Sequence, residues 1–166
     1  MATRTLDTLF HDTLRDIYCA ERKALQALRK NARAATSPDL KAAFETHRTE
    51  TEGQIERLQR VFEIIGKRAQ GKACAAIDGI TEEAEEIMEE YAGSPALDAG
   101  LLAAAQAVEH YEITRYGTLA AWADQLGLTE AAELLRETLA EEERTDLLLT
   151  GLAVPAINAA AERQAG

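Results

Sequence analysis

Proline and β-branched runs are scarce in this chain of 166 residues, which contains only three prolines. Proline breaks helices and β-branched residues have lower helix propensity, so their scarcity favours helical structure. Hydrophobic residues make up 46% and charged residues 28% of the chain, as in ordinary globular proteins, and disorder is not expected. At this length the simplest organisation is one domain with its own core.

Positive charge is also scarce, with 18 Lys and Arg against 29 Asp and Glu and a net charge of −11. Nucleic acids and anionic membranes bind basic surfaces, and the basic residues here form no stripe, so neither partner is expected. No apolar run approaches the roughly 18 residues of a membrane span. The first residues, MATRTLDTLFHDTL, lack the apolar core and cleavage site of a signal peptide. We therefore expect a cytoplasmic protein.

Cysteine is nearly absent, and Cys19 and Cys74 have no CxxC spacing. Two reduced thiols are the plain prediction. The sequence also lacks a glycine-rich phosphate loop and a nucleophile elbow, so the enzyme classes that depend on these motifs have no support.

Apolar residues recur at the spacing of a helix through most of the chain. This period predicts four long helices, at about 4–34, 38–66, 95–126 and 130–150. Residues 67–80 lack a clear period and are predicted as a connection, followed by a short helix that Thr81 caps. The pattern predicts two helical hairpins joined by a long crossover, which is a ferritin-like four-helix bundle of the all-α class.

Local signals set the expected helix ends. Ser-Pro pairs at 37–38 and 94–95 are typical of helix starts, and Thr129 is expected to be an N-cap. Gly151 and Pro155 are expected to end the last long helix. The bundle is thus predicted to span residues 1–153, with a frayed or weakly helical tail at 154–166.

Several acidic side chains fall on the apolar faces of these helices when each residue is placed 100° from the last. The residues predicted to face the interior are Glu21, His47, Glu50, Glu109, Glu112, Glu142 and Asp146. Glu50 lies on the shoulder of its stripe rather than at the centre. Each set lies roughly 22 Å from the turn of its hairpin at 1.5 Å per residue, so the six acids and one imidazole are predicted to meet at one level.

Burying these like charges together costs several kcal/mol per ion, against a total stability of about 5–15 kcal/mol. Two divalent cations would balance most of the charge. Inward Glu residues with Glu-x-x-His motifs form the ligand set of di-iron and di-manganese bundles. Here the second helix has the order His47-x-x-Glu50 and the last helix has no histidine. The predicted site is therefore rich in oxygen, which favours Fe or Mn over Zn or Cu.

Three further side chains border this predicted site. Tyr18 and Tyr116 lie near Glu21 and Glu112, where each phenol would either hydrogen-bond a ligand carboxylate or simply belong to the core. His110 is expected to point toward a neighbouring helix or solvent.

Four segments carry a resemblance to a known family: RDIYCAE, HRTETEGQIERL, AAQAVEHYEITRYGTL and LRETLAEEERTDLLLTGLA. Together with the crossover KACAAIDGITEEAEEIMEE they resemble the YciE/YciF family of ferritin-like bacterial stress proteins, over about residues 5–153. That family is similar to rubrerythrin and ferritin in fold, and the resemblance implies a metal-binding homodimer.

The resemblance also implies roles for the inward residues. It places the ferritin-type bridging pair at Glu50 and Glu142 and the terminal pair at Glu21 and Glu109. The supporting or alternative ligands are then His47, Glu112 and Asp146.

Two functions follow as alternatives. The first is a protein with two Fe or Mn ions per chain that reacts with oxygen or peroxide in a stress response. The second is a structural or interaction bundle with a vestigial or single-metal site and no catalysis. The missing Glu-x-x-His histidines put ferroxidase activity in doubt, so whether the protein is an enzyme stays open.

Overall fold

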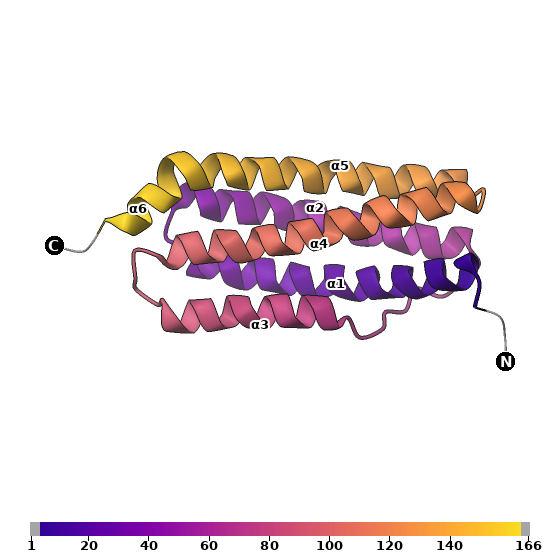
Figure 1. Ribbon diagram of the computed structural model, residues 1–166, viewed down its shortest axis with the longest axis horizontal. Helices are drawn as coiled ribbons and strands as arrows, with labels where there is room; N and C mark the ends of the chain where they lie inside the picture. Colours follow the sequence, from indigo (N-terminus) through magenta and orange to yellow (C-terminus); the bar gives the residue numbers. More distant parts are fainter. Residues whose placement is uncertain (1–3, 164–166) are drawn as a thin grey trace.

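The computed structural model describes residues 4–163 as helices that run along one long axis (Figure 1). The four long helices are α1 (Leu6–Ala34), α2 (Pro38–Ile64), α4 (Leu97–Gln125) and α5 (Thr129–Leu152). The crossover between the two hairpins carries the shorter α3 (Ala75–Glu90). This arrangement confirms the predicted all-α bundle of two antiparallel hairpins with a fifth helix in the crossover.

The four long helices close into a ring of contacts. α1 packs on α2 and α4 packs on α5 within the hairpins, while α2 contacts α5 and α1 contacts α4 between them. α3 lies outside this ring against α1 and α4 (Figure 1). Ion pairs from Lys23 to Asp78 and from Lys30 to Glu85 join α1 to α3.

The turn of the first hairpin is tied to the start of α4. The Ser37 hydroxyl caps α2 by accepting a hydrogen bond from the Leu40 N–H at 3.3 Å. The buried Asp98 carboxylate accepts hydrogen bonds from the N–H groups of Thr36 and Ser37, at 2.8 Å and 2.7 Å, and from the Thr36 hydroxyl at 2.6 Å. One carboxylate thus satisfies donors that the turn would otherwise leave unpaired.

The start of α3 differs from the prediction at Thr81. The helix begins at Ala75, because Ile77 and Ala84 are two turns apart on one face and both are buried. The Thr81 hydroxyl donates to the Ile77 carbonyl at 2.8 Å, inside the helix. The prediction of an N-cap at Thr81 was wrong.

Two other helix starts are shifted by one or two residues. α4 begins at Leu97 and not at Pro95, and the Ser94 hydroxyl accepts a hydrogen bond from the Ala96 N–H at 3.1 Å. Thr129 is the first residue of α5 rather than its cap, since the residue before the helix is Leu128.

The chain stays helical beyond Gly151, where the sequence predicts that the last long helix ends and a frayed or weakly helical tail follows. α5 ends at Leu152, one π-helical turn covers Ala153–Ile157, and α6 covers Asn158–Glu162. Pro155 has no backbone N–H and its ring clashes with the preceding turn of an α-helix, so a widened turn accommodates it. Ala153 and Ile157 are buried in the same apolar cluster as Leu101 of α4, which holds this segment on the bundle.

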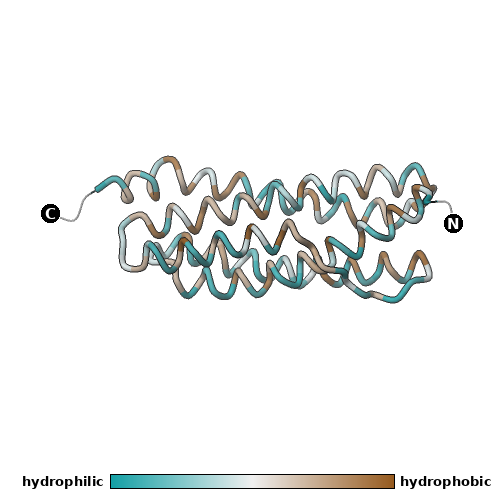
Figure 2. Tube along the Cα trace, turned by 60° about the horizontal axis from the view of Figure 1, so that its bottom comes forward, coloured by the Kyte–Doolittle hydropathy of each residue, from teal (hydrophilic) through white to brown (hydrophobic). Residues whose placement is uncertain are grey.

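Apolar and polar segments alternate along every helix (Figure 2). The buried apolar residues form two clusters, one around Phe10, Leu14 and Phe62 and the other around Leu40 and Leu101. The buried charged residues of the bundle belong to neither cluster. Within residues 4–163, no helix combines the length and apolar character needed to cross a membrane.

Candidate metal centre

Four helices each place a polar side chain in the interior of the bundle. α1 contributes Glu21, α2 contributes His47, α4 contributes Glu109 and Glu112, and α5 contributes Glu142. Each of these residues is at most 3% exposed. We call them the buried cluster.

Four members of the buried cluster share one small space. One ligand atom from each of His47, Glu109, Glu112 and Glu142 lies within 4.8 Å of the others. The His47 Nε2 is 3.0 Å from the Glu109 Oε1 and 3.7 Å from the Glu142 Oε2. This imidazole therefore faces carboxylates from both α4 and α5.

Glu21 is held by a phenol. The Tyr116 hydroxyl donates a hydrogen bond to the Glu21 Oε1, and both residues are fully buried. Tyr18 takes no part in this contact, because its hydroxyl accepts a hydrogen bond from the Gln59 amide at 3.2 Å. Of the two candidate phenols, Tyr116 contacts a carboxylate of the buried cluster and Tyr18 belongs to the core.

The buried cluster has far more acceptors than donors. Six of the eight carboxylate oxygens of Glu21, Glu109, Glu112 and Glu142 are buried and have no hydrogen-bond partner among the described residues. Buried polar atoms in native proteins are nearly always paired, and an unpaired one costs about 1–3 kcal/mol or more. These oxygens are therefore free to bind protons or a cation.

Burial dominates the protonation of the acids. It raises the pKa of Glu21 to about 7, although the Tyr116 hydrogen bond and His47 act in the opposite direction. Burial also raises the pKa of Glu112 and that of Glu142 well above their ordinary values, and neighbouring carboxylates add to both shifts. At neutral pH the metal-free cluster therefore retains protons that metal binding would release.

The pKa values of His47 and Glu50 shift in opposite directions, because a positive imidazole and a negative carboxylate stabilise each other. Burial alone would lower the pKa of His47, but Glu109, Glu50 and Glu142 together raise it well above its ordinary value. The adjacent imidazole of His47 lowers the pKa of Glu50, against the effect of partial burial. The His47 Nδ1 is 3.6 Å from the Glu50 Oε2.

Glu50 lies at the edge of the buried cluster, as its position on the shoulder of the stripe predicts. Its side chain is 32% exposed, whereas that of His47 is 4% exposed. A cavity of about 200 Å³ opens between α2 and α5 and is lined by His47, Glu50, Arg144 and Thr145. This cavity connects His47 with the surface.

The structure does not bring Asp146 to the buried cluster. Its Oδ1 accepts a hydrogen bond from Gln106 and lies 3.1 Å from the Nε2 of His110, which is exposed. The buried positions of α5 are Ala131, Ala132, Leu135, Thr138, Glu142, Thr145 and Leu149, so Asp146 lies at the margin of the interior face, where its side chain is 20% exposed.

The sequence pattern did not single out two buried threonines of α5. One of them, Thr145, lies beside the buried cluster. The Thr145 hydroxyl lies 3.4 Å from both the His47 Nδ1 and the Glu50 Oε2. Thr138 accepts a hydrogen bond from Arg57 at 3.1 Å, and Arg57 also pairs with Glu141. Threonine occurs on both faces of helices, so periodicity alone gives no signal for these residues.

The donor set suits a metal ion. Carboxylate oxygens and one imidazole nitrogen are the ligands that Mn and Fe(II) accept, and the unpaired oxygens are available as further ligand atoms. The cluster could therefore hold a metal ion.

Comparison with known proteins identifies the family. Residues 5–162 match the family described as Domain of unknown function (DUF892). The chain is also 46% identical to Protein YciF of Escherichia coli K12 over 166 residues, which cover 99% of this chain and 100% of that protein. The chain belongs to the DUF892 family, as the resemblance to YciE/YciF proteins predicted.

Solved structures of similar proteins show the same fold. The E. coli stress protein YciF matches with a TM-score of 0.89 at 46% identity, over 94% of this chain and 99% of that one. YcfI of Rhodopseudomonas palustris matches with a TM-score of 0.87 at 45% identity, over 90% and 96% of the two chains. A more distant protein from Xanthomonas campestris, at 22% identity and a TM-score of 0.71, over 93% of this chain and 95% of that one, shares the fold.

Proposed function

We propose that the buried cluster holds two Fe or Mn ions and that the loaded protein reacts with oxygen or peroxide. The observation that carries this proposal is the set of six buried carboxylate oxygens without a partner. Four ionised carboxylates carry four negative charges, which two divalent ions would balance if His47 is neutral. A single ion would leave net negative charge in the interior.

The residues have distinct proposed roles. His47, Glu109, Glu112 and Glu142 supply ligand atoms, because these atoms already lie together. Glu21 is the fifth donor, and Tyr116 fixes the direction of its carboxylate. Glu50 is half-buried beside the cavity between α2 and α5 and would receive ions from solvent.

Ions of Fe or Mn would supply the redox chemistry toward oxygen or peroxide. The chain itself supplies a largely apolar interior, which solvent reaches through the cavity beside His47 and Glu50. His47 has to lose its proton before it can act as a ligand, and its raised pKa makes metal binding strongly pH-dependent.

A stress role is the biological part of the proposal. It rests on the 46% identity to YciF, which is called a stress protein in E. coli. A protein that binds redox metals in a closed interior would remove an oxidant or keep a reactive ion out of solution, and either action suits that role.

A matched pair of variants tests the metal site. Glu142→Gln removes one buried ligand charge, and Glu143→Gln makes the same change at the next, exposed position of α5. We expect Glu142→Gln to lose at least half of the metal bound by the parent protein after anaerobic loading with Fe(II) or Mn(II), with helix content unchanged by circular dichroism. Glu143→Gln should bind like the parent. Equal metal content in both variants would contradict the proposed ligand set.

A structural bundle without catalysis is the second candidate. The raised pKa values of Glu112 and Glu142 favour it, because protonated carboxyls could fill the interior without metal. One relative, YcfI, also carries a name that proposes a structural role. This candidate predicts no stoichiometric metal after loading, so the same measurement separates the two.

A further inference from the structure

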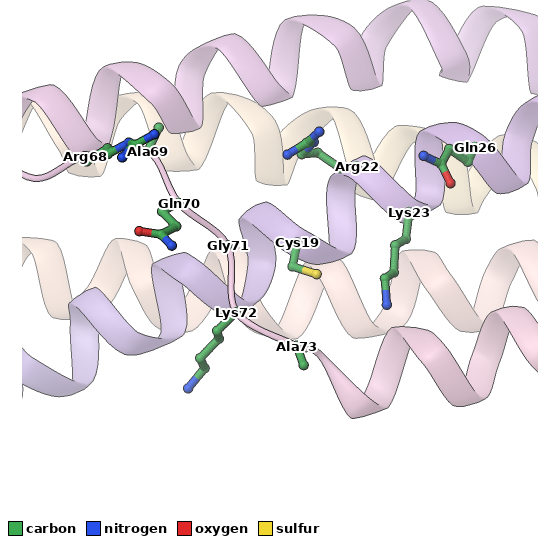
Figure 3. A pocket seen from close by; sticks show the side chains of 10 residues that line it. All are labelled: Cys19, Arg22, Lys23, Gln26, Arg68, Ala69, Gln70, Gly71, Lys72 and Ala73. Atoms are coloured by element: carbon green, nitrogen blue, oxygen red, sulfur yellow. The ribbon is translucent and has the colours of Figure 1, made fainter.

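A second site lies on the outer surface of α1, away from the buried cluster. The crossover residues before α3 pass over α1 there and border an open cavity of about 620 Å³ (Figure 3). Cys19, Arg22, Lys23 and Gln26 line it from α1, and residues 68–73 line it from the crossover. No member of the buried cluster lines this cavity.

The lining is cationic in a chain whose net charge is −11. Four of the ten lining residues are Arg22, Lys23, Arg68 and Lys72, and none of the ten is acidic. Lys23 pairs with Asp78 of α3. Within residues 4–163, Arg22, Arg68 and Lys72 have no carboxylate at ion-pair distance, so their charge is available to a ligand.

The crossover is fixed in place over α1. The Arg15 side chain donates to the Gln70 carbonyl at 3.2 Å, and the Lys72 N–H donates to the Arg15 carbonyl at 3.2 Å. Gly71 lies so close to α1 that a Cβ there would be 3.1 Å from the Cys19 Cβ. These contacts hold residues 70–72 against α1 before any ligand arrives, which reduces the entropic cost of binding.

We propose that this cavity binds a multiply charged phosphate compound, either an inorganic oligophosphate or a nucleoside polyphosphate. Guanidinium groups bind phosphate oxygens through paired, charge-assisted hydrogen bonds, and Arg22 and Arg68 supply two of them from opposite walls. The amides of Gln26 and Gln70 add neutral donors. A volume of about 620 Å³ lies in the range of small-molecule sites and exceeds what a single phosphate fills.

A structural role for the cations explains only part of the lining. Lys23 has such a role, because it ties α1 to α3. Arg22 lies over the Tyr18 ring at 5.9 Å, a contact that leaves its N–H groups free. Arg68 is exposed and Lys72 is half-buried, and neither makes an ion pair within the described residues.

Calorimetry on the full-length protein tests the proposal, with tripolyphosphate and ATP as probes at low and at physiological ionic strength. We expect both to bind, and we expect Arg68→Gln/Lys72→Gln and, independently, Arg22→Gln to weaken binding at least tenfold. Arg33→Gln/Lys41→Gln removes two exposed charges elsewhere and should leave the affinity unchanged. Tighter binding of ATP than of tripolyphosphate would identify a nucleotide site, and the reverse order an oligophosphate site.

Three results would overturn this proposal. The first is that neither probe binds, and the second is that all the variants bind equally well. The third is that a single-stranded oligonucleotide binds more tightly than either probe, which would make the surface a nucleic-acid site. Glu142→Gln should retain phosphate binding, since the buried cluster takes no part in it. Loss of phosphate binding in Glu142→Gln would assign the phosphate to the metal centre instead.

Discussion

Tyr116 shows how single contacts set the chemistry of the buried cluster. Its hydroxyl donates to Glu21, and this hydrogen bond lowers a pKa that burial raises to about 7. Without a donor, an ionised carboxylate in this position would carry the full cost of desolvation. The phenol therefore helps to keep Glu21 available as an ionised ligand near neutral pH.

Tyr116→Phe tests this contact in metal-free protein. We expect the free energy of unfolding at pH 8 to fall by about 2 kcal/mol, because the variant leaves both Glu21 oxygens unpaired. The loss should be smaller at pH 5, where Glu21 is protonated. Urea denaturation at the two pH values measures both effects. Tyr91→Phe, at an exposed tyrosine, is the control, and equal stability of Tyr116→Phe and the parent at pH 8 would refute the assigned role.

Residue periodicity located most of the buried cluster but not its edges. Glu21, Glu109, Glu112 and Glu142 fall near the centres of apolar stripes, and the structure buries each of them. Asp146 is displaced because α5 turns Thr138 and Thr145 inward. A helical wheel gives directions only to within the width of a stripe, so side chains at its margin depend on how the neighbouring helices pack.

The sequence predicts the presence of the long helices well, but it predicts their first and last residues poorly. The long apolar periods correctly predicted α1, α2, α4 and α5. The start of α3 was missed because Gly79 and the short stretch before Thr81 obscure the pair Ile77 and Ala84. Pro155 predicts a stop, whereas a π-helical turn accommodates it and burial of Ile157 stabilises the continuation.

Two glycine substitutions should change stability in opposite directions. Gly53 lies within α2 and has open space around its Cα, so Gly53→Ala should raise the free energy of unfolding by about 0.5–1 kcal/mol through helix propensity. Gly127 ends α4 with a φ of +72°, so Gly127→Ala should lower it by about 1–2 kcal/mol. Thermal denaturation followed by circular dichroism measures both, and shifts of the same sign would contradict the helix boundaries.

The whole bundle combines apolar clusters with a buried acidic cluster, and this makes its stability depend on pH. An acid whose pKa is raised in the folded state stabilises the fold fully below its unfolded pKa, and this contribution disappears as the pH rises through the folded value. Glu21 therefore contributes below about pH 4.5 and loses its contribution as the pH rises through about 7. Glu112 and Glu142 act in the same direction. Glu50 has a lowered pKa, so its contribution to the stability of the fold is lost only as the pH falls below its ordinary pKa.

Metal-free protein should consequently become more stable as the pH falls from 8 to 5. Glu21 alone should contribute on the order of 3 kcal/mol to the free energy of unfolding. Metal-loaded protein should show the opposite trend, because protons compete with the ions for the same ligands. Urea denaturation across this range, with and without a chelator, checks both trends, and a metal-free protein that loses stability between pH 8 and pH 5 would contradict the assigned protonation.

The homodimer implied by the family resemblance stays a prediction for the assembled molecule, and sedimentation analysis of the purified protein tests it.

The fold could be predicted at the scale of the whole molecule, because connection lengths and apolar periods leave few arrangements of four helices. The crossover cavity could not, because its lining residues meet only when the crossover packs on α1.

The metal content per chain tests the proposed di-metal centre directly. Protein purified without chelators and loaded anaerobically with Fe(II) or Mn(II) should retain about two ions per chain by elemental analysis after removal of unbound metal. Retention of about two ions would establish the di-metal centre and justify measuring oxygen or peroxide consumption. Retention of no stoichiometric metal under either loading would contradict the account and leave a bundle whose buried acids are protonated.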